Sequence, residues 1–129
     1  MEEKNARKIL LVEDDVTLAE MYQKKLSLEG FDVLVATSGG EGLQVAINNK
    51  PDLILLDIML PGIDGMTVMK KLRDNPWGRE VPIIILTNLN ADDAILKGVV
   101  EGHPAYYLMK SSTDPRNLAE KIKEVLNTV

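Results

Sequence analysis

The sequence contains no cysteine, no long hydrophobic run and no cluster of basic residues, and each absence excludes a class of protein. Without cysteine, the chain forms neither disulfide bonds nor thiolate metal sites, which is compatible with a reducing cytosol. Its longest apolar runs, such as residues 53–56 and 83–86, are far shorter than the roughly 20 residues of a membrane-spanning helix. With 15 Lys and Arg against 20 Asp and Glu, the net charge of −5 disfavours direct binding to nucleic acid.

The length of 129 residues suits one domain that buries a hydrophobic core without disulfides or structural metals. The chain begins with MEEKNARK, which lacks the apolar stretch of a secretory signal. We therefore expect a single cytoplasmic domain over residues 1–129, with an ordered core of about residues 8–127 and no membrane insertion.

Five short apolar segments have the composition of β-strands. The first, third and fourth are continuous in Ile, Leu and Val, which is typical of a parallel sheet covered by helices on both faces. The fifth segment is weaker. The predicted strands are residues 9–12, 33–36, 53–56, 83–86 and 106–109.

The segments between the strands have helical periodicity and recognisable start signals. One helix is predicted over residues 16–29, with Asp15 as its cap and Gly30 as its stop. Strands and helices that alternate five times predict a doubly wound α/β domain with a five-stranded parallel sheet. The other start signals are Ser38 with Glu41 in capping-box spacing, Asp64, the group Asn90, Asp92 and Asp93, and Asp114 before Pro115, from where the helical period continues to Val129.

Charged and hydroxyl residues follow four of the predicted strands. They are Glu13 and Asp14 after the first strand, Asp57 after the third, Thr87 after the fourth and Lys110 after the fifth. Sites in such folds lie at the carboxyl ends of the strands, so we expect these residues to share one pocket. Carboxylates in one pocket repel each other unless a cation intervenes, and an all-oxygen set without His or Cys suits Mg²⁺. A carboxylate beside a divalent cation, with a lysine and a hydroxyl nearby, can accept a phosphoryl group.

Each of these residues also has an ordinary structural explanation. An acidic triplet such as residues 13–15 is common at a helix start, and Asp57 precedes a stretch rich in turn-forming residues. Lys110 alone would be a solvated lysine, and Thr87 alone a hydroxyl bound to the next turn. Chance placement does not explain why all of them fall at one edge of the predicted sheet, and this favours a functional site.

Four motifs in order resemble the response-regulator receiver family of two-component signalling, of the chemotaxis-regulator type, over about residues 8–127. The resemblance implies a flavodoxin-like fold with strand order 2-1-3-4-5. It also implies a signalling phosphoprotein rather than a conventional enzyme, one that catalyses its own phosphorylation and slow autodephosphorylation. The motifs are LLVEDD (residues 10–15), LLDIMLPGIDG (55–65), IILT (84–87) and YLMK (107–110).

The resemblance implies a role for each acidic residue of the predicted site. Asp57 is then the phosphoacceptor for a sensor histidine kinase or a phosphotransfer protein. Asp14 binds Mg²⁺ directly, Glu13 helps through a water molecule, and the backbone carbonyl of Met59 completes the set of protein ligands.

The same resemblance implies that Thr87 and Lys110 hold the phosphoryl oxygens, and that Tyr107 swings inward when Thr87 moves to the phosphate. The change then reaches the surface of the fourth helix, fifth strand and fifth helix, where an unidentified downstream protein binds and a weak homodimer is allowed. No output domain follows Val129, so we expect a stand-alone receiver, although a domain excised from a longer regulator or hybrid kinase would look identical.

Three features depart from the family pattern. Asn88 stands beside the expected phosphate where a small residue is usual, and Ser111 stands where a proline after a cis peptide bond is common. A cis bond before Ser would cost about 3 kcal/mol, which favours a trans peptide there. The segment 102–105 has one residue more than usual, which leaves Tyr106 as an alternative switch residue.

These departures motivate a second hypothesis, a pseudo-receiver that keeps the fold and acts as a phosphorylation-independent interaction module. The intact acidic, hydroxyl and lysine set argues against it. A phosphatase of the haloacid dehalogenase type would need a second Asp two residues after Asp57, where the chain has Met59. A flavin carrier would need a Ser/Thr/Gly-rich loop after the first strand, where the chain is acidic.

Overall fold

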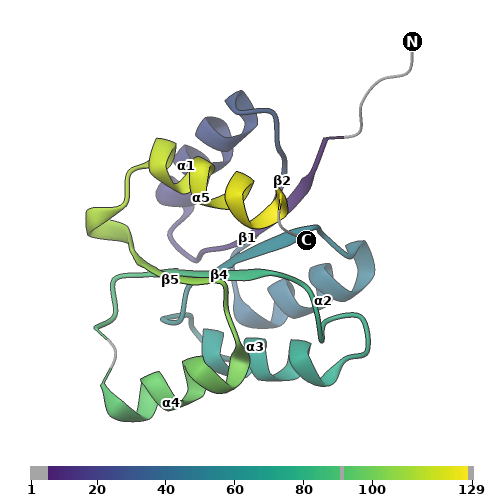
Figure 1. The fold of residues 1–129 in the computed structure, drawn as a ribbon, viewed down its shortest axis with the longest axis vertical. Helices are drawn as coiled ribbons and strands as arrows, with labels where there is room; N and C mark the ends of the chain where they lie inside the picture. The colour runs from purple at the N-terminus through teal and green to yellow at the C-terminus, as the bar shows by residue number, and fades with distance from the viewer. Residues whose placement is uncertain (1–5, 91, 128–129) are drawn as a thin grey trace.

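The computed structural model describes residues 6–90 and 92–127, and strands and helices alternate along this part of the chain (Figure 1). The strands form one parallel sheet in the order β2-β1-β3-β4-β5, which confirms the predicted flavodoxin-like α/β fold. The strands are β1 (Lys8–Val12), β2 (Asp32–Ala36), β3 (Leu53–Leu56), β4 (Ile83–Thr87) and β5 (Tyr106–Met109). The helices are α1 (Val16–Leu28), α2 (Gly39–Asn49), α3 (Gly65–Asp74), α4 (Asp93–Gly102), the short 3₁₀ turn η1 (Lys110–Ser112) and α5 (Pro115–Asn127).

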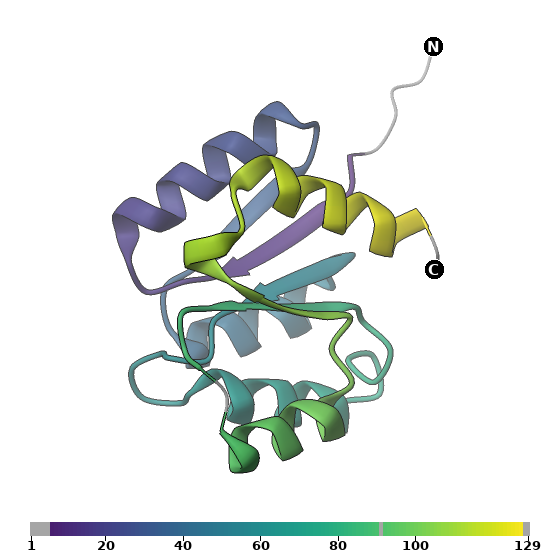
Figure 2. The ribbon, with the colours of Figure 1, turned by 60° about the vertical axis from the view of Figure 1, so that its left-hand side comes forward.

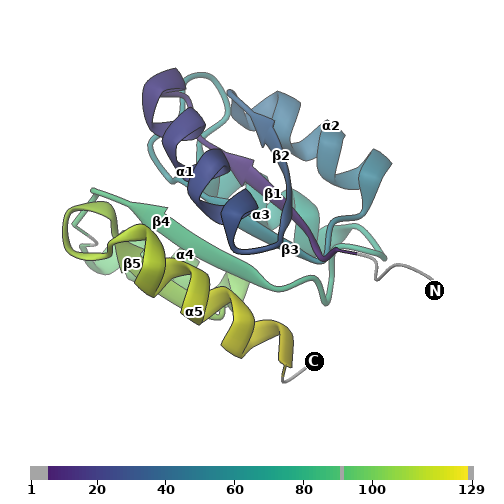
Figure 3. The same cartoon turned by 90° about the horizontal axis from the view of Figure 1, so that it is seen from above.

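Helices cover both faces of the sheet and bury two separate hydrophobic clusters. Helices α1 and α5 lie on one face and α2, α3 and α4 on the other (Figures 1 and 2), and the view in Figure 3 has α1 and α5 in front of the strands. Successive residues of a strand point to opposite faces, so Ile9 and Leu11 join the α1/α5 cluster whereas Leu10 and Val12 join the other. Burial on both faces explains why the central strands are continuously apolar.

The helix starts follow the predicted capping signals, in which a side-chain oxygen accepts a backbone N–H three residues on. Asp92, rather than Asn90, caps α4, because its Oδ1 accepts the N–H of Ile95 at 3.0 Å. The same bond is made by Asp15 to Leu18 (3.1 Å), Ser38 to Glu41 (3.1 Å), Asp64 to Thr67 (2.8 Å) and Asp114 to Asn117 (2.8 Å).

One helix boundary and one capping contact differ from the sequence prediction. Helix α1 ends at Leu28, one residue early, because the N–H of Glu29 turns back to the carbonyl of Leu26 and that of Gly30 to the carbonyl of Ser27, each at 3.0 Å. The predicted capping box at Ser38 is only half formed, since the Glu41 carboxylate accepts the N–H of Thr37 at 2.8 Å. Val129, where the helical pattern was expected to end, lies outside the described residues.

The parallel register brings the ends of β1, β3, β4 and β5 to one edge of the sheet. Val12 pairs with Leu56, and Thr87 pairs with Met109, so the next residue of each strand emerges at the same edge. The N–H of Asp57 donates to the carbonyl of Val12 at 3.2 Å, which extends the β1–β3 pairing to the acidic residues. The fold therefore places the predicted site residues together.

The start of α3 packs directly against the backbone of Asp57. A Cβ added to Gly65 would lie 2.1 Å from the Asp57 carbonyl oxygen, and the Gly65 N–H donates to the carbonyl of Ile58 at 2.9 Å. Only glycine permits this approach, so Gly65 fixes the loop that carries Asp57. No helix in residues 6–90 and 92–127 has the length and apolar character needed to span a membrane.

We predict that Gly65→Ala lowers the free energy of unfolding by about 2 kcal/mol or more, because the new methyl group meets backbone rather than a flexible side chain. Gly40→Ala is the matched control. Apart from its chain neighbours and the backbone of α2 itself, no atom of the described residues lies within 4 Å of its Cβ position, so the substitution should be neutral or stabilise by up to about 1 kcal/mol. Urea denaturation measures both, and equal stability of the two variants would contradict the packing described.

Candidate functional site

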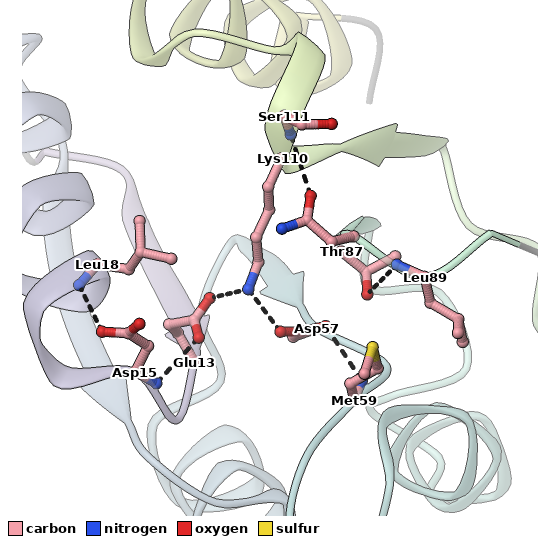
Figure 4. A network of polar contacts seen from close by, with 10 residues as sticks. Glu13, Asp15, Leu18, Asp57, Met59, Thr87, Leu89, Lys110 and Ser111 are labelled. Carbon is pink, nitrogen blue, oxygen red and sulfur yellow. Dashed lines mark hydrogen bonds and ion pairs between the residues drawn. The ribbon is translucent and has the colours of Figure 1, made fainter.

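Lys110 joins the ends of three strands through its ammonium group. Its Nζ lies 2.5 Å from Glu13 Oε1 and 2.6 Å from Asp57 Oδ2 (Figure 4), and the three side chains are 10%, 2% and 5% exposed. Burial by itself would lower the pKa of Lys110, but hydrogen bonds and attraction from the two carboxylates outweigh it and raise that pKa. Lys110 is therefore a fully charged bridge at neutral pH.

The carboxylate of Asp14 joins those of Glu13 and Asp57 in one acidic cluster. Oxygen atoms of Glu13, Asp14 and Asp57 all lie within 4.8 Å of one another, with Glu13 and Asp57 buried and Asp14 exposed. Backbone donors hold the two buried groups, since Asp15 N–H bonds Glu13 Oε2 at 3.0 Å and Met59 N–H bonds Asp57 Oδ1 at 3.1 Å. One ammonium does not balance three carboxylates, and an all-oxygen set with excess negative charge and an exposed Asp14 fits Mg²⁺.

Thr87 is fully buried at the end of β4, beside Asp57 in Figure 4. Its hydroxyl accepts the N–H of Leu89 at 3.3 Å, and the carbonyl of the same Leu89 accepts the hydroxyl of Tyr107 at 2.5 Å. The backbone of Leu89 thus links Thr87 to Tyr107, a connection that the sequence did not indicate.

The two neighbouring tyrosines of β5 lie on opposite faces of the sheet. Tyr107 packs against the cluster under α3 and α4, and burial followed by the charge of Asp57 raises its pKa. Tyr106 packs against the other cluster and donates its hydroxyl hydrogen bond to Glu124 Oε2 at 2.5 Å. The ammonium of Lys121 lies 4.7 Å from the centre of its ring. Of the two, Tyr107 alone is connected to the loop after Thr87.

Two of the residues that depart from the family pattern, Asn88 and Ser111, touch each other. The N–H of Ser111 donates to Oδ1 of Asn88 at 3.1 Å, which joins the loop after β4 to the turn after β5. No peptide bond in residues 6–90 and 92–127 is cis, so the peptide before Ser111 is trans. His103 closes α4 in the left-handed conformation at φ 52°, and β5 still starts at Tyr106 in register with Ile84.

Comparison with known proteins agrees with this geometry. The model of the family described as response regulator receiver domain matches residues 9–123. The chain is 37% identical over 95 residues to response regulator PleD of Caulobacter vibrioides, covering 74% of this chain and 21% of PleD. It is 36% identical over 120 residues to the alkaline phosphatase synthesis regulator PhoP of Bacillus subtilis, covering 93% of this chain and 48% of PhoP.

Solved structures superpose over almost the whole chain. A CheY-like receiver domain protein from Methanospirillum hungatei gives a TM-score of 0.88 at 31% identity and covers 96% of each chain. The BeF₃-activated N-terminal receiver domain of RstA from Klebsiella pneumoniae gives 0.82 at 36% identity and covers 93% of this chain and 98% of that one.

The chain belongs to the response regulator receiver domain family. It is a signalling module of two-component systems rather than a classical enzyme, and this membership implies a histidine kinase partner in general. The chain spans about a fifth to a half of the curated relatives described above.

We predict that Lys110→Met lowers the free energy of unfolding by about 1–3 kcal/mol at neutral pH in the absence of divalent cations, because two buried carboxylates lose their counter-charge. Lys123→Met is the matched control, since its ion pair with Glu29 is exposed to solvent and should contribute much less to the free energy of unfolding. Because the pKa of Lys110 is raised in the folded protein, Lys110 stabilises the fold fully at pH values below the ordinary lysine pKa of about 10.4. This stabilisation is lost as the pH rises through the raised pKa of the folded protein. Denaturation curves that show equal losses for both variants at neutral pH would contradict the bridging role of Lys110.

Proposed function

We propose that Asp57 accepts a phosphoryl group from the phosphohistidine of a sensor histidine kinase or a phosphotransfer protein. The observation that carries the proposal is the placement of Asp57 Oδ2 against Lys110 Nζ at 2.6 Å, beside Glu13 and Asp14. A carboxylate oxygen of Asp57 forms the new P–O bond, while the P–N bond to histidine breaks and the nitrogen keeps the electron pair. The product is an acyl phosphate on Asp57.

The acidic residues fit a magnesium ion by the chemistry of their donors. Asp14 and Asp57 would hold Mg²⁺ directly, Glu13 would hold it through water, and the backbone carbonyl of Met59 would complete the protein ligands. When bound, Mg²⁺ would neutralise negative charge on the phosphoryl oxygens. Lys110 would bind another of the phosphoryl oxygens, because its ammonium already contacts the carboxylate of Asp57 that accepts the phosphoryl group.

Thr87 and Tyr107 are the residues that would pass the change to the surface. A Thr87 hydroxyl that turns to the phosphate must give up the N–H of Leu89, whose carbonyl holds Tyr107. The movement would alter the surface formed by α4, β5 and α5, where Leu96 and Val100 of α4 are 47% and 67% exposed. We infer that an unidentified downstream protein, or weakly a second copy of this chain, binds there.

We infer further that residues 1–129 form a single receiver domain with an ordered core of about residues 8–127, and that it works in the cytoplasm, where histidine kinases act. The connection from Thr87 through Leu89 to Tyr107 supports a working switch rather than a phosphorylation-independent interaction module.

The mass of the intact protein tests the proposed reaction. Incubation with Mg²⁺ and acetyl phosphate should add about 80 Da to the wild type and nothing to Asp57→Asn, because the amide cannot form an acyl phosphate. Asp74→Asn, at an exposed position on α3, is the control and should gain the same mass as the wild type. A gain by Asp57→Asn would refute the assignment of Asp57. An unchanged wild-type mass, with acetyl phosphate and with a histidine kinase, would favour the pseudo-receiver.

A magnesium titration tests the ion site. Mg²⁺ at 100 times its dissociation constant should stabilise the wild type by about 2.7 kcal/mol. Asp14→Asn should lose most of this effect because it removes one carboxylate of the cluster. Asp15→Asn, whose amide oxygen can still cap α1, is the neighbouring control and should respond like the wild type. Equal responses of the two variants would contradict the site.

A further inference from the structure

We propose that Asn88 is a positioning residue for Lys110: by accepting the N–H of Ser111, it holds the turn that aims the ammonium at Asp57. The inference rests on the proposed function of Asp57. It concerns a side chain that contacts neither Glu13 nor Asp57 through any hydrogen bond in the described structure.

The Asn88 contact extends the connection between β4 and β5 beyond their last paired residues. The ladder between β4 and β5 ends with Thr87 opposite Met109. Asn88 follows β4 and Lys110 follows β5 directly. Beyond the last backbone pair, the Asn88 side chain connects the two segments through its 3.1 Å hydrogen bond from the N–H of Ser111. The bond therefore ties together the two loops that carry the expected phosphoryl ligands.

The turn after β5 depends on outside support. Within the described part of the chain, η1 is a single 3₁₀ turn of three residues without a side-chain cap of its own. Lys110 is the first residue of this turn, and its flexible side chain places Nζ 2.5 Å from Glu13 Oε1 and 2.6 Å from Asp57 Oδ2. A displacement of the turn by about 1 Å would disturb both contacts, and errors of that size slow reactions strongly.

Asn88 is well suited to act on positioning rather than on overall stability. It is exposed, so its truncation opens no cavity in the core. Its partner is a backbone N–H, so the contact survives a change of the Ser111 side chain but is lost when the Asn88 acceptor is removed. This difference provides a variant pair that separates the hydrogen bond from other effects.

The test compares Asn88→Ala, Asn88→Asp and Ser111→Ala in two measurements. The first is the rate of phosphorylation by acetyl phosphate with saturating Mg²⁺, as a function of donor concentration. Asn88→Ala should lower the maximal rate by about three- to tenfold, the range expected for loss of one such hydrogen bond, with the half-saturating donor concentration unchanged. Ser111→Ala keeps the N–H and should match the wild type.

The second measurement is hydrogen exchange of the Ser111 amide by NMR. Exchange should accelerate in Asn88→Ala and return to the wild-type rate in Asn88→Asp, which keeps a δ-oxygen acceptor. A wild-type maximal rate in Asn88→Ala would overturn the inference. A slower rate with unchanged Ser111 exchange, or a change confined to the half-saturating concentration, would overturn it as well. A wild type that accepts no phosphoryl group would instead refute the proposed function, and the exchange data would still report whether Asn88 holds the turn.

Discussion

The repulsion among Glu13, Asp14 and Asp57 is the constraint on which the site depends. Carboxylates this close share a pocket only with positive charge nearby, and Lys110 supplies it through contacts of 2.5 and 2.6 Å. One ammonium does not balance three carboxylates, so the pocket keeps an excess of negative charge that favours a divalent cation. The charge balance of the site thus explains why it would bind a divalent cation beside Lys110.

The two-faced sheet explains where this chemistry lies. Because helices cover both faces, strand residues such as Leu55 and Ile84 are fully buried, and polar groups can gather only at the strand ends. Gly65 brings α3 against the backbone of Asp57, so the loop carrying that carboxylate is fixed by packing. The phosphoacceptor we propose therefore sits on a rigid frame, whereas Lys110 reaches it from a short turn.

Most of the fold could be predicted from the sequence because its signals are local. Apolar runs predicted each strand to within one residue at either end, and the cap at Asp64 was recognisable from residue type and position. The contacts that join the loops could not be predicted in this way. The bond of Asn88 to Ser111 and the link of Thr87 to Tyr107 through Leu89 depend on distances between loops that no spacing encodes.

The central claim is that Asp57 carries an acyl phosphate, and the most direct test is to locate it chemically. Borohydride reduces an aspartyl phosphate to homoserine, which peptide mass spectrometry identifies at a single position. After treatment of the wild type with a phosphodonor and Mg²⁺, the account predicts homoserine at position 57 and unmodified aspartate at position 14. Homoserine at another position, or an unreduced Asp57 in a protein that has gained phosphoryl mass, would contradict it.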